Sequence, residues 1–163
     1  MCLVDDGIVI GDNCYQPVNG DVRDDLTWDQ ADEYCREKML GILTELESED
    51  EKIKVLSARC IIVLNKTFQL ESAMSNWYHP QQSTARVDWW LGMTDKEADG
   101  EYRWMSSGEE LQNENWWRKG EPDSNLDCVS LSGDGGLQAE ICSNNNSPDG
   151  MITRKPLCKL GSN

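Results

Sequence analysis

The first part of the chain alternates apolar and polar residues. Within residues 1–16, Val4, Ile8 and Ile10 are separated by Asp, Gly and Asn residues that favour turns. A period of two places every second side chain on one face of a strand. This pattern predicts a short N-terminal hairpin over residues 1–16.

A helical period replaces this alternation from Thr27 onwards. Thr27 and Gln30 have the spacing of a capping box, in which a hydroxyl and an amide side chain satisfy exposed N–H groups at the start of a helix. We therefore expect a first helix to begin after Thr27. The residues expected on its buried face are Trp28, Ala31, Cys35 and Met39.

A second periodic segment opens at Ser48. Ser48 and Glu51 repeat the capping-box spacing, and the acidic residues there suit the positive end of a helix dipole. The expected buried face of this second helix is Ile53, Leu56, Cys60 and Val63. The long segment at about 57–88 fits both a continued helix and a buried strand, and we favour the helix.

Beyond Asp88 the chain carries short aromatic clusters separated by Gly, Asp, Asn and Ser. The clusters are Trp89-Trp90, Tyr102-Arg103-Trp104 and Trp116-Trp117, and they predict short strands joined by ordered loops. Helices followed by strands, without strand–helix–strand alternation, predict an α+β fold. A length of 163 residues suits one domain, residues 1–163.

The negative charge of the chain makes some classes of binding partner unfavourable. A formal net charge of -15 opposes binding to nucleic acid or to anionic membrane surfaces. No apolar stretch approaches the ~20 residues that span a bilayer, so we expect no membrane insertion. The acidic surface fits both a role in solubility and a cluster of carboxylates that holds calcium.

The cysteine content points to an oxidising compartment. Seven cysteines are many for a cytosolic chain of this length, and their spacing matches no zinc or redox motif. Asn65 and Asn145 stand in glycosylation sequons. We expect a secreted protein whose signal peptide has already been removed, since residues 1–16 lack the basic and then apolar pattern of such a signal.

The order of these motifs resembles the long-form C-type lectin-like family. The resemblance covers Trp28-x2-Ala31-x3-Cys35, then Trp90-Leu91-Gly92-Met93, Tyr102-Arg103-Trp104, the run from Asn115 to Asp123, Asp127-Cys128, Cys142 and Cys158. It implies two helices flanking small antiparallel sheets, with a long loop region and a disulfide-stapled scaffold. It also implies a recognition module without catalytic activity.

The same resemblance implies the pairing of the cysteines. The implied disulfides are Cys2–Cys14, Cys35–Cys158 and Cys128–Cys142. Loop-entropy estimates give roughly 4–5 kcal/mol for a bridge that closes about 124 residues and about 3 kcal/mol for one that closes about 15. Cys60 is left over, and two interpretations stay open: a buried thiol, or an intersubunit disulfide that makes a dimer.

The family's sugar-binding calcium position is only partly kept. Glu121-Pro122-Asp123 resembles the family's first ligand triplet, with a Glu typical of mannose-type and an Asp typical of galactose-type members. Leu126 stands where a later Glu is expected, and Leu137-Gln138-Ala139 replaces Trp-Asn-Asp. Glu140 and Asp134 are candidate substitutes for the missing ligands. The alternative interpretation of Glu121-Pro122-Asp123 is a turn that forms without metal.

The family's auxiliary calcium position retains more acids. Asp95, Asp99 and Asp127, with Asp123 or Ser124, offer about four oxygens of the six to eight that calcium takes. An exposed acidic turn is the alternative interpretation.

Aromatic side chains complete the expected ligand face. Trp116 and Trp117 lie next to each other, and we expect one of them in the core and one, Trp117, at the ligand. The predicted ligand-binding set is therefore Glu121, Pro122, Asp123 and Trp117.

Three functional hypotheses follow. The first is a non-catalytic domain that binds a glycan or glycoprotein with support from calcium. The second is a calcium-independent domain that binds a protein ligand. An enzyme is disfavoured, because the single histidine, His79, lies beside Pro80 and no nucleophile or zinc motif is present.

Overall fold

The computed structural model describes residues 7–18, 26–57, 86–144 and 152–161. Its helices confirm the predicted α+β class. They are α1 (Trp28–Glu37), a second helix over residues 49–57 and the 3-10 helix η1 (Glu114–Trp116). The strands are β1 (Ile8–Ile10), β2 (Asn13–Pro17), β3 (Ile42–Leu43), β4 (Arg86–Thr94), β5 (Arg103–Trp104), β6 (Cys128–Leu131), β7 (Leu137–Glu140) and β8 (Ile152–Leu160).

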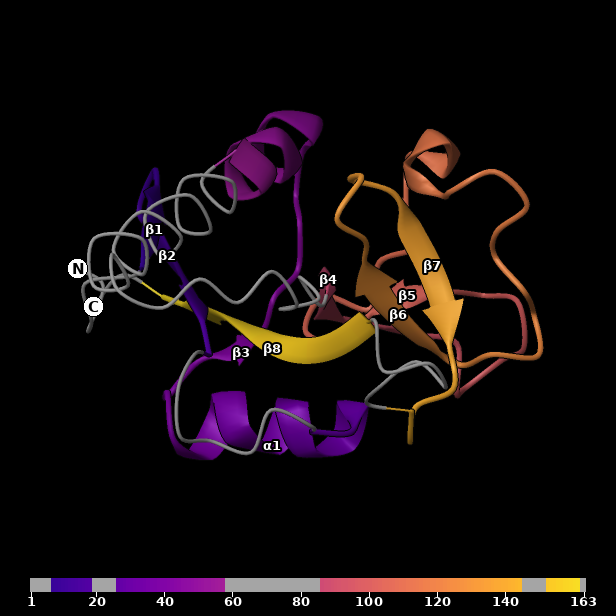
Figure 1. Ribbon diagram of the computed structural model, residues 1–163, viewed down its shortest axis with the longest axis horizontal. Coiled ribbons are helices and arrows are strands. Elements are labelled where there is room, and N and C mark those ends of the chain that lie inside the picture. Colours follow the sequence, from indigo (N-terminus) through magenta and orange to yellow (C-terminus); the bar gives the residue numbers. More distant parts are fainter. Residues whose placement is uncertain (1–6, 19–25, 58–85, 145–151, 162–163) are drawn as a thin grey trace, which may run out of the picture.

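Strand β8 lies at the centre of the sheet. The strand order is β1-β2-β8-β4-β6-β7, with β3 also paired to β8 and β5 to β4. Strands β2 and β3 pair with β8 in the antiparallel sense, whereas β4 pairs with it in parallel from Arg86↔Ile152 to Trp90↔Pro156. Figure 1 shows α1 along one side of β8 and the second helix on the other side. The parallel pair is an addition to the antiparallel sheets that we expected.

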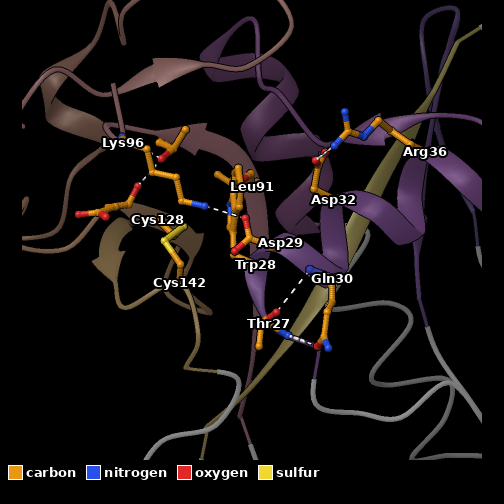
Figure 2. Close-up of polar contacts among 12 residues, drawn as sticks. Thr27, Trp28, Asp29, Gln30, Asp32, Arg36, Leu91, Lys96, Cys128 and Cys142 are labelled. Atoms are coloured by element: carbon orange, nitrogen blue, oxygen red, sulfur yellow. Dashed lines mark hydrogen bonds and ion pairs between the residues drawn. A yellow bond between two sulfur atoms is a disulfide. The ribbon is translucent and has the colours of Figure 1, made fainter. Parts of the chain in front are cut away.

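The first helix begins as its capping box predicts. The backbone N–H of Gln30 donates to Thr27 Oγ1 at 3.4 Å, and the backbone N–H of Thr27 donates to Gln30 Oε1 at 3.0 Å (Figure 2). The buried positions of α1 are Trp28, Ala31, Asp32 and Cys35. Met39 lies beyond the helix and is half-buried. The predicted face is therefore correct through Cys35, and Asp32 joins it through an ion pair with Arg36.

Trp28 joins α1 to the core strand. Its indole N–H donates to the carbonyl of Leu91 at 2.8 Å, and its backbone N–H donates to the carbonyl of Cys142 at 2.9 Å. The Lys96 ammonium lies 4.6 Å from the ring centroid of Trp28 and 2.6 Å from Asp29 Oδ1 (Figure 2). A buried ring with a satisfied N–H on one side and a cation over its face is a stable anchor for the helix.

The second helix begins at the predicted place but buries a different face. The Glu51 amide N–H donates to Ser48 Oγ at 3.1 Å, which confirms the Ser48 cap. Val55 is fully buried, whereas Ile53 is 51% exposed, so the expectation that Ile53 faces the core is wrong. The buried positions include Lys52, whose ammonium lies 4.9 Å from the Trp116 ring centroid. A long charged side chain thus covers apolar surface that the periodic pattern assigned to an aliphatic one.

Two predicted disulfides are confirmed. Cys35 is bonded to Cys158 at a sequence separation of 123, and Cys128 is bonded to Cys142 at a separation of 14. Cys14 is also disulfide-bonded, and its predicted partner Cys2 lies outside the described residues. The first of these bridges joins α1 to the central strand β8.

Several predictions concern residues outside the described part of the chain. These are Cys60, Asn65, His79, Asn145 and most of the segment at about 57–88. They stay predictions. None of the described helices has the length and apolar character needed to cross a membrane.

Gly92 lies at a close approach of β4 to β3. A Cβ at this position would lie 2.6 Å from the carbonyl oxygen of Leu43, whereas one at Gly161 would meet nothing within 4 Å. Backbone cannot shift as a side chain can, so Gly92→Ala should lower the free energy of unfolding by about 1–3 kcal/mol. Urea denaturation of Gly92→Ala beside the control Gly161→Ala tests this. Equal midpoints for the two variants would contradict the packing described.

Leu40 is the residue of the α1–β3 connection that carries backbone strain. It adopts φ 53° and its side chain is 86% exposed, so packing offsets little of the strain. A left-handed conformation costs an ordinary side chain roughly 1–2 kcal/mol, whereas Asn adopts it readily. Leu40→Asn should therefore raise the melting temperature by a few degrees. Glu33→Gln, an exposed change on α1, should leave it unchanged, and a lower melting temperature for Leu40→Asn would count against the strain.

Candidate functional site

The long loop between β5 and β6, residues 105–127, forms one face of the domain. It is tied to the sheet by an isolated bridge between Trp117 and Leu137 and by another between Arg103 and Glu110. Helix η1 lies within it and is capped by Asn113, whose Oδ1 accepts the Asn115 amide N–H at 3.1 Å. The loop is therefore held against the strands over much of its length.

The two adjacent tryptophans divide as predicted. Trp116 is only 5% exposed and belongs to the core, whereas Trp117 is half-buried beside Tyr102. The rings of Trp117 and Tyr102 lie edge to face, with centroids 4.9 Å apart. Trp117 is consequently the one of the pair that reaches the loop surface.

The predicted ligand triplet is engaged in contacts within the protein. The Glu121–Pro122 peptide bond is cis, and Glu121 Oε2 accepts the Ala139 amide N–H at 3.0 Å. Asp123 is exposed, and its Oδ1 accepts the backbone N–H of Asn125 at 3.1 Å and its side-chain amide at 2.8 Å. These hydrogen bonds, the backbone one first, lower the pKa of Asp123 below its usual value.

The residues around this triplet do not fit a sugar-type calcium ion. Leu126 packs against the core and Ala139 is buried, so two expected ligand positions carry hydrocarbon. Glu140 is bound to Gln138 and Arg154, with Glu140 Oε1 2.5 Å from Arg154 Nη2. Calcium needs several oxygens free to turn towards it. The two remaining carboxylates, Glu121 and Asp123, are too few.

Glu140 and Asp134, the candidate substitutes, have other partners. Burial raises the pKa of Glu140, an effect that the neighbouring Arg154 opposes. Asp134 Oδ2 lies 3.1 Å from Arg118 Nη2, and its Oδ1 accepts the Gly136 amide N–H at 3.1 Å. Neither carboxylate therefore completes the ligand set around Glu121.

The auxiliary position fits a cation better, through Asp95. This residue directly follows β4 and is 1% exposed; its Oδ2 accepts the Gly100 amide N–H at 2.8 Å. Its Oδ1 is buried without a well-formed hydrogen bond among the described residues, and the Tyr102 hydroxyl is a group that interacts with this carboxylate. A buried carboxylate oxygen left without a donor is costly unless a cation or water meets it.

Asp127 lies beside Asp95. The Asp127 carbonyl accepts the Asp95 amide N–H at 3.2 Å and the Thr94 hydroxyl at 2.6 Å. Asp99 is exposed in the same turn. In residues 7–18, 26–57, 86–144 and 152–161, however, no three His, Cys, Asp or Glu side chains converge as a metal-ligand group. The structure thus brings the backbones of Asp95 and Asp127 together, and the Asp95 carboxylate caps the turn that carries Asp99.

Tyr102 connects this acidic turn to the loop. Its hydroxyl lies 3.0 Å from the carbonyl oxygen of Asp123 and 2.5 Å from that of Leu126. Burial, and next the charge of Asp95, raise the pKa of Tyr102 well above its usual range. The hydroxyl therefore stays protonated and holds the chain around Asp123 against β5.

An open cavity of about 600 Å³ adjoins the predicted ligand residues. The side chains at its wall that bear on binding are Glu101, Tyr102, Glu114, Trp117, Glu121 and Pro122. Carboxylates accept hydrogen bonds from hydroxyl or amine groups, and an indole face packs against apolar surface. The cavity can hold a small polar ligand with one apolar face.

Sequence reasoning missed the polar groups behind the loop. Arg118 Nη1 donates to Gln138 Oε1 at 2.7 Å, and Gln138 Nε2 donates to Asp88 Oδ2 at 3.0 Å. Asp88 is fully buried in β4. The signal for these contacts was Gln138 itself, a polar residue between Leu137 and Ala139 at the position of an expected metal ligand.

The chain matches the family described as the lectin C-type domain over residues 24–147. A curated relative, C-type lectin domain family 4 member F of Rattus norvegicus, is 41% identical over 44 residues, which cover 26% of this chain and 8% of the relative. The chain thus aligns with less than a tenth of that relative's length.

Solved structures share the fold at low sequence identity. The carbohydrate-recognition domain of the mouse scavenger receptor C-type lectin has a TM-score of 0.67 at 18% identity, covering 99% of this chain and 98% of that one. Human lithostathine has a TM-score of 0.64 at 22% identity, with coverage of 97% and 98%.

A third structure is the cow C-type carbohydrate-recognition domain of CD23, determined in the presence of a GlcNAc2Man3 oligosaccharide. It has a TM-score of 0.63 at 21% identity and covers 99% of this chain and 98% of that one. With the domain match over residues 24–147 and two of the predicted disulfides in place, the chain belongs to the C-type lectin domain family.

Proposed function

We propose that the protein is a non-catalytic recognition domain that binds a glycan or glycoprotein in the cavity beside Glu121 and Trp117. The cavity of about 600 Å³ is the observation that carries this proposal. Its size falls within the usual range for small-ligand sites. The cow relative whose structure was determined with an oligosaccharide has the same fold, which makes a glycan the first ligand to test.

The chemistry of the cavity wall suits a sugar. Trp117 is half-buried and braced by Tyr102 at 4.9 Å between centroids, so its ring is held in place before a ligand arrives. A rigid aromatic platform loses little entropy on binding the apolar face of a sugar ring. Glu101, Glu114 and Glu121 supply acceptors for hydroxyl groups around it.

Calcium has a supporting role in this proposal, at Asp95 and Asp127. The buried, unpartnered Oδ1 of Asp95 is the feature that favours it. Asp99, Asp123 and Ser124 lie in exposed turns nearby in sequence and would supply further oxygens. When bound, calcium would neutralise these acids and brace the loop; the ligand would contact Glu121 and Trp117 directly.

The second candidate is a calcium-independent domain that binds a protein. The hydrocarbon side chains at Leu126 and Ala139 favour it, since they remove the metal through which sugar hydroxyls are bound in related lectins. Both candidates act outside the cell, where the disulfides are stable. Neither includes a catalytic step, and a dimer through Cys60 remains compatible with both.

Removal of the Trp117 ring should weaken glycan binding. Trp117→Ala should reduce the affinity for the best ligand on a glycan array by about tenfold, which is ~1.4 kcal/mol. Glu114→Gln should reduce it less, and Glu33→Gln on α1 should not change it. If no glycan binds in calcium or in chelator and a protein ligand does, the second candidate is correct.

Removal of the Asp95 carboxylate should abolish calcium binding. In titration calorimetry the wild type should take up one calcium ion, Asp95→Asn should take up none, and Asp123→Asn should bind with reduced affinity. The expected loss at Asp95 follows from its buried oxygen, which has no donor to replace the metal. A wild type that binds no calcium at millimolar concentration would remove calcium from the proposal.

A further inference from the structure

The side chain of Arg118 reaches strand β7, where the family resemblance implies ligands of the sugar-type calcium. Its Nη1 donates to Gln138 Oε1 at 2.7 Å, and its Nη2 lies 3.1 Å from Asp134 Oδ2. Gln138 stands at the position of an expected metal ligand. Arg118 and Glu121 line the same open cavity. A protein cation is therefore present close to the residues that a metal would have joined.

The backbone of Arg118 is fixed to the edge of the sheet. Strand β7 is the last strand in the sheet order. Its outward carbonyl at Leu137 accepts the Arg118 amide N–H at 2.9 Å, and its outward N–H at Ala139 donates to Glu121 Oε2. The Arg118 carbonyl in turn accepts the Glu121 amide N–H at 2.9 Å. The segment from Arg118 to Glu121 thus covers an edge that would otherwise expose unpaired groups.

Gly136 makes room for the Arg118 side chain. A Cβ at position 136 would lie 2.3 Å from Arg118 Cγ. Glycine is therefore required for the arginine stem to pass over the turn between β6 and β7 and to reach Gln138.

Gln138 connects the Arg118 side chain to buried residues of the sheet. Its Nε2 lies 3.0 Å from Asp88 Oδ2, 3.2 Å from Ser130 Oγ and 2.7 Å from Glu140 Oε1. The two amide hydrogens are shared among these three acceptors, and the Gln138 carbonyl oxygen is left to accept from Arg118. Asp88 and Ser130 are fully buried, so this anchor is rigid.

We propose that Arg118 is a positioning residue that replaces the sugar-type calcium of related lectins and holds the Glu121-Pro122-Asp123 segment against β7 without metal. The guanidinium brings a positive charge among acidic side chains, as a metal ion would. It also brings a planar set of hydrogen-bond donors, one of which is accepted by the Gln138 carbonyl oxygen. This inference deepens the proposed function and rests on it for the statement that Glu121 contacts ligand. The contacts of Arg118 with Gln138 and Asp134 do not depend on a ligand.

The amide hydrogen of Ala139 provides a direct readout, because it is bonded to the Glu121 carboxylate. Asp95→Asn is the background for this test, because it should take up no calcium at the auxiliary position; amide exchange followed by NMR should then show the same protection of Ala139 and Glu121 in calcium and in EDTA. Arg118→Ala should speed exchange of both amides at least tenfold, with Arg118→Lys intermediate. The neighbouring exposed cation is the matched control, and Lys119→Ala should leave both rates unchanged.

Two further variants keep the test decisive should Arg118→Ala fold poorly. Gly136→Ala retains every functional group but displaces the arginine stem, and Gln138→Ala removes its acceptor; both should speed the same two amides. Protection in Asp95→Asn that is lost in EDTA, or rates that none of the Arg118, Gly136 and Gln138 variants changes, would overturn the role of Arg118. Glycan binding is measured separately, so its absence with unchanged exchange behaviour would count against the proposed function alone.

Discussion

The pairing of β8 with three strands from earlier in the chain is the constraint on which the remaining structure depends. This strand pairs with β2, β3 and β4, and Cys158 within it is bonded to Cys35 of α1. A loop closed over a sequence separation of 123 removes much of the freedom of the unfolded chain. Strand β4 can then pair in parallel with β8, and Trp28 can donate to the carbonyl of Leu91. The long loop has a fixed base because these contacts hold β4.

The free side of the sheet presents a different physical problem. Strand β7 has a neighbour on one side only, and its outward groups need partners. Backbone N–H of Arg118 and the carboxylate of Glu121 meet them, with Gln138 and buried Asp88 behind. Buried polar groups are costly unless each is paired, so this arrangement orders the loop as a unit. One oxygen of the Glu121 carboxylate, which resembles a metal ligand in sequence, is thereby bonded to the backbone of β7.

The two acidic regions differ in the groups that are available to meet their carboxylates. Around Asp95 and Asp127 an unpartnered oxygen favours a cation, whereas around Glu121 the protein supplies its own donors. Between them Tyr102 bonds to carbonyls of the loop and braces the ring of Trp117. Under the proposed function, a ligand would meet carboxylates and an aromatic ring directly. Its polarity comes from residues of the chain itself.

Local signals in the sequence determined the helices, the caps and the fold class, because capping boxes and periodic patterns act within a few residues. The Thr27 and Ser48 caps are present, and spacing against a known family predicted two of the disulfides. The second helix buries a different face from the predicted one, with Ile53 exposed. Lys52 is buried there instead, over the ring of Trp116, a residue far away in the sequence. The fate of each loop carboxylate was likewise decided only by the tertiary structure. A carboxylate binds metal or a backbone N–H according to which is nearest, and residues far apart in sequence set that distance.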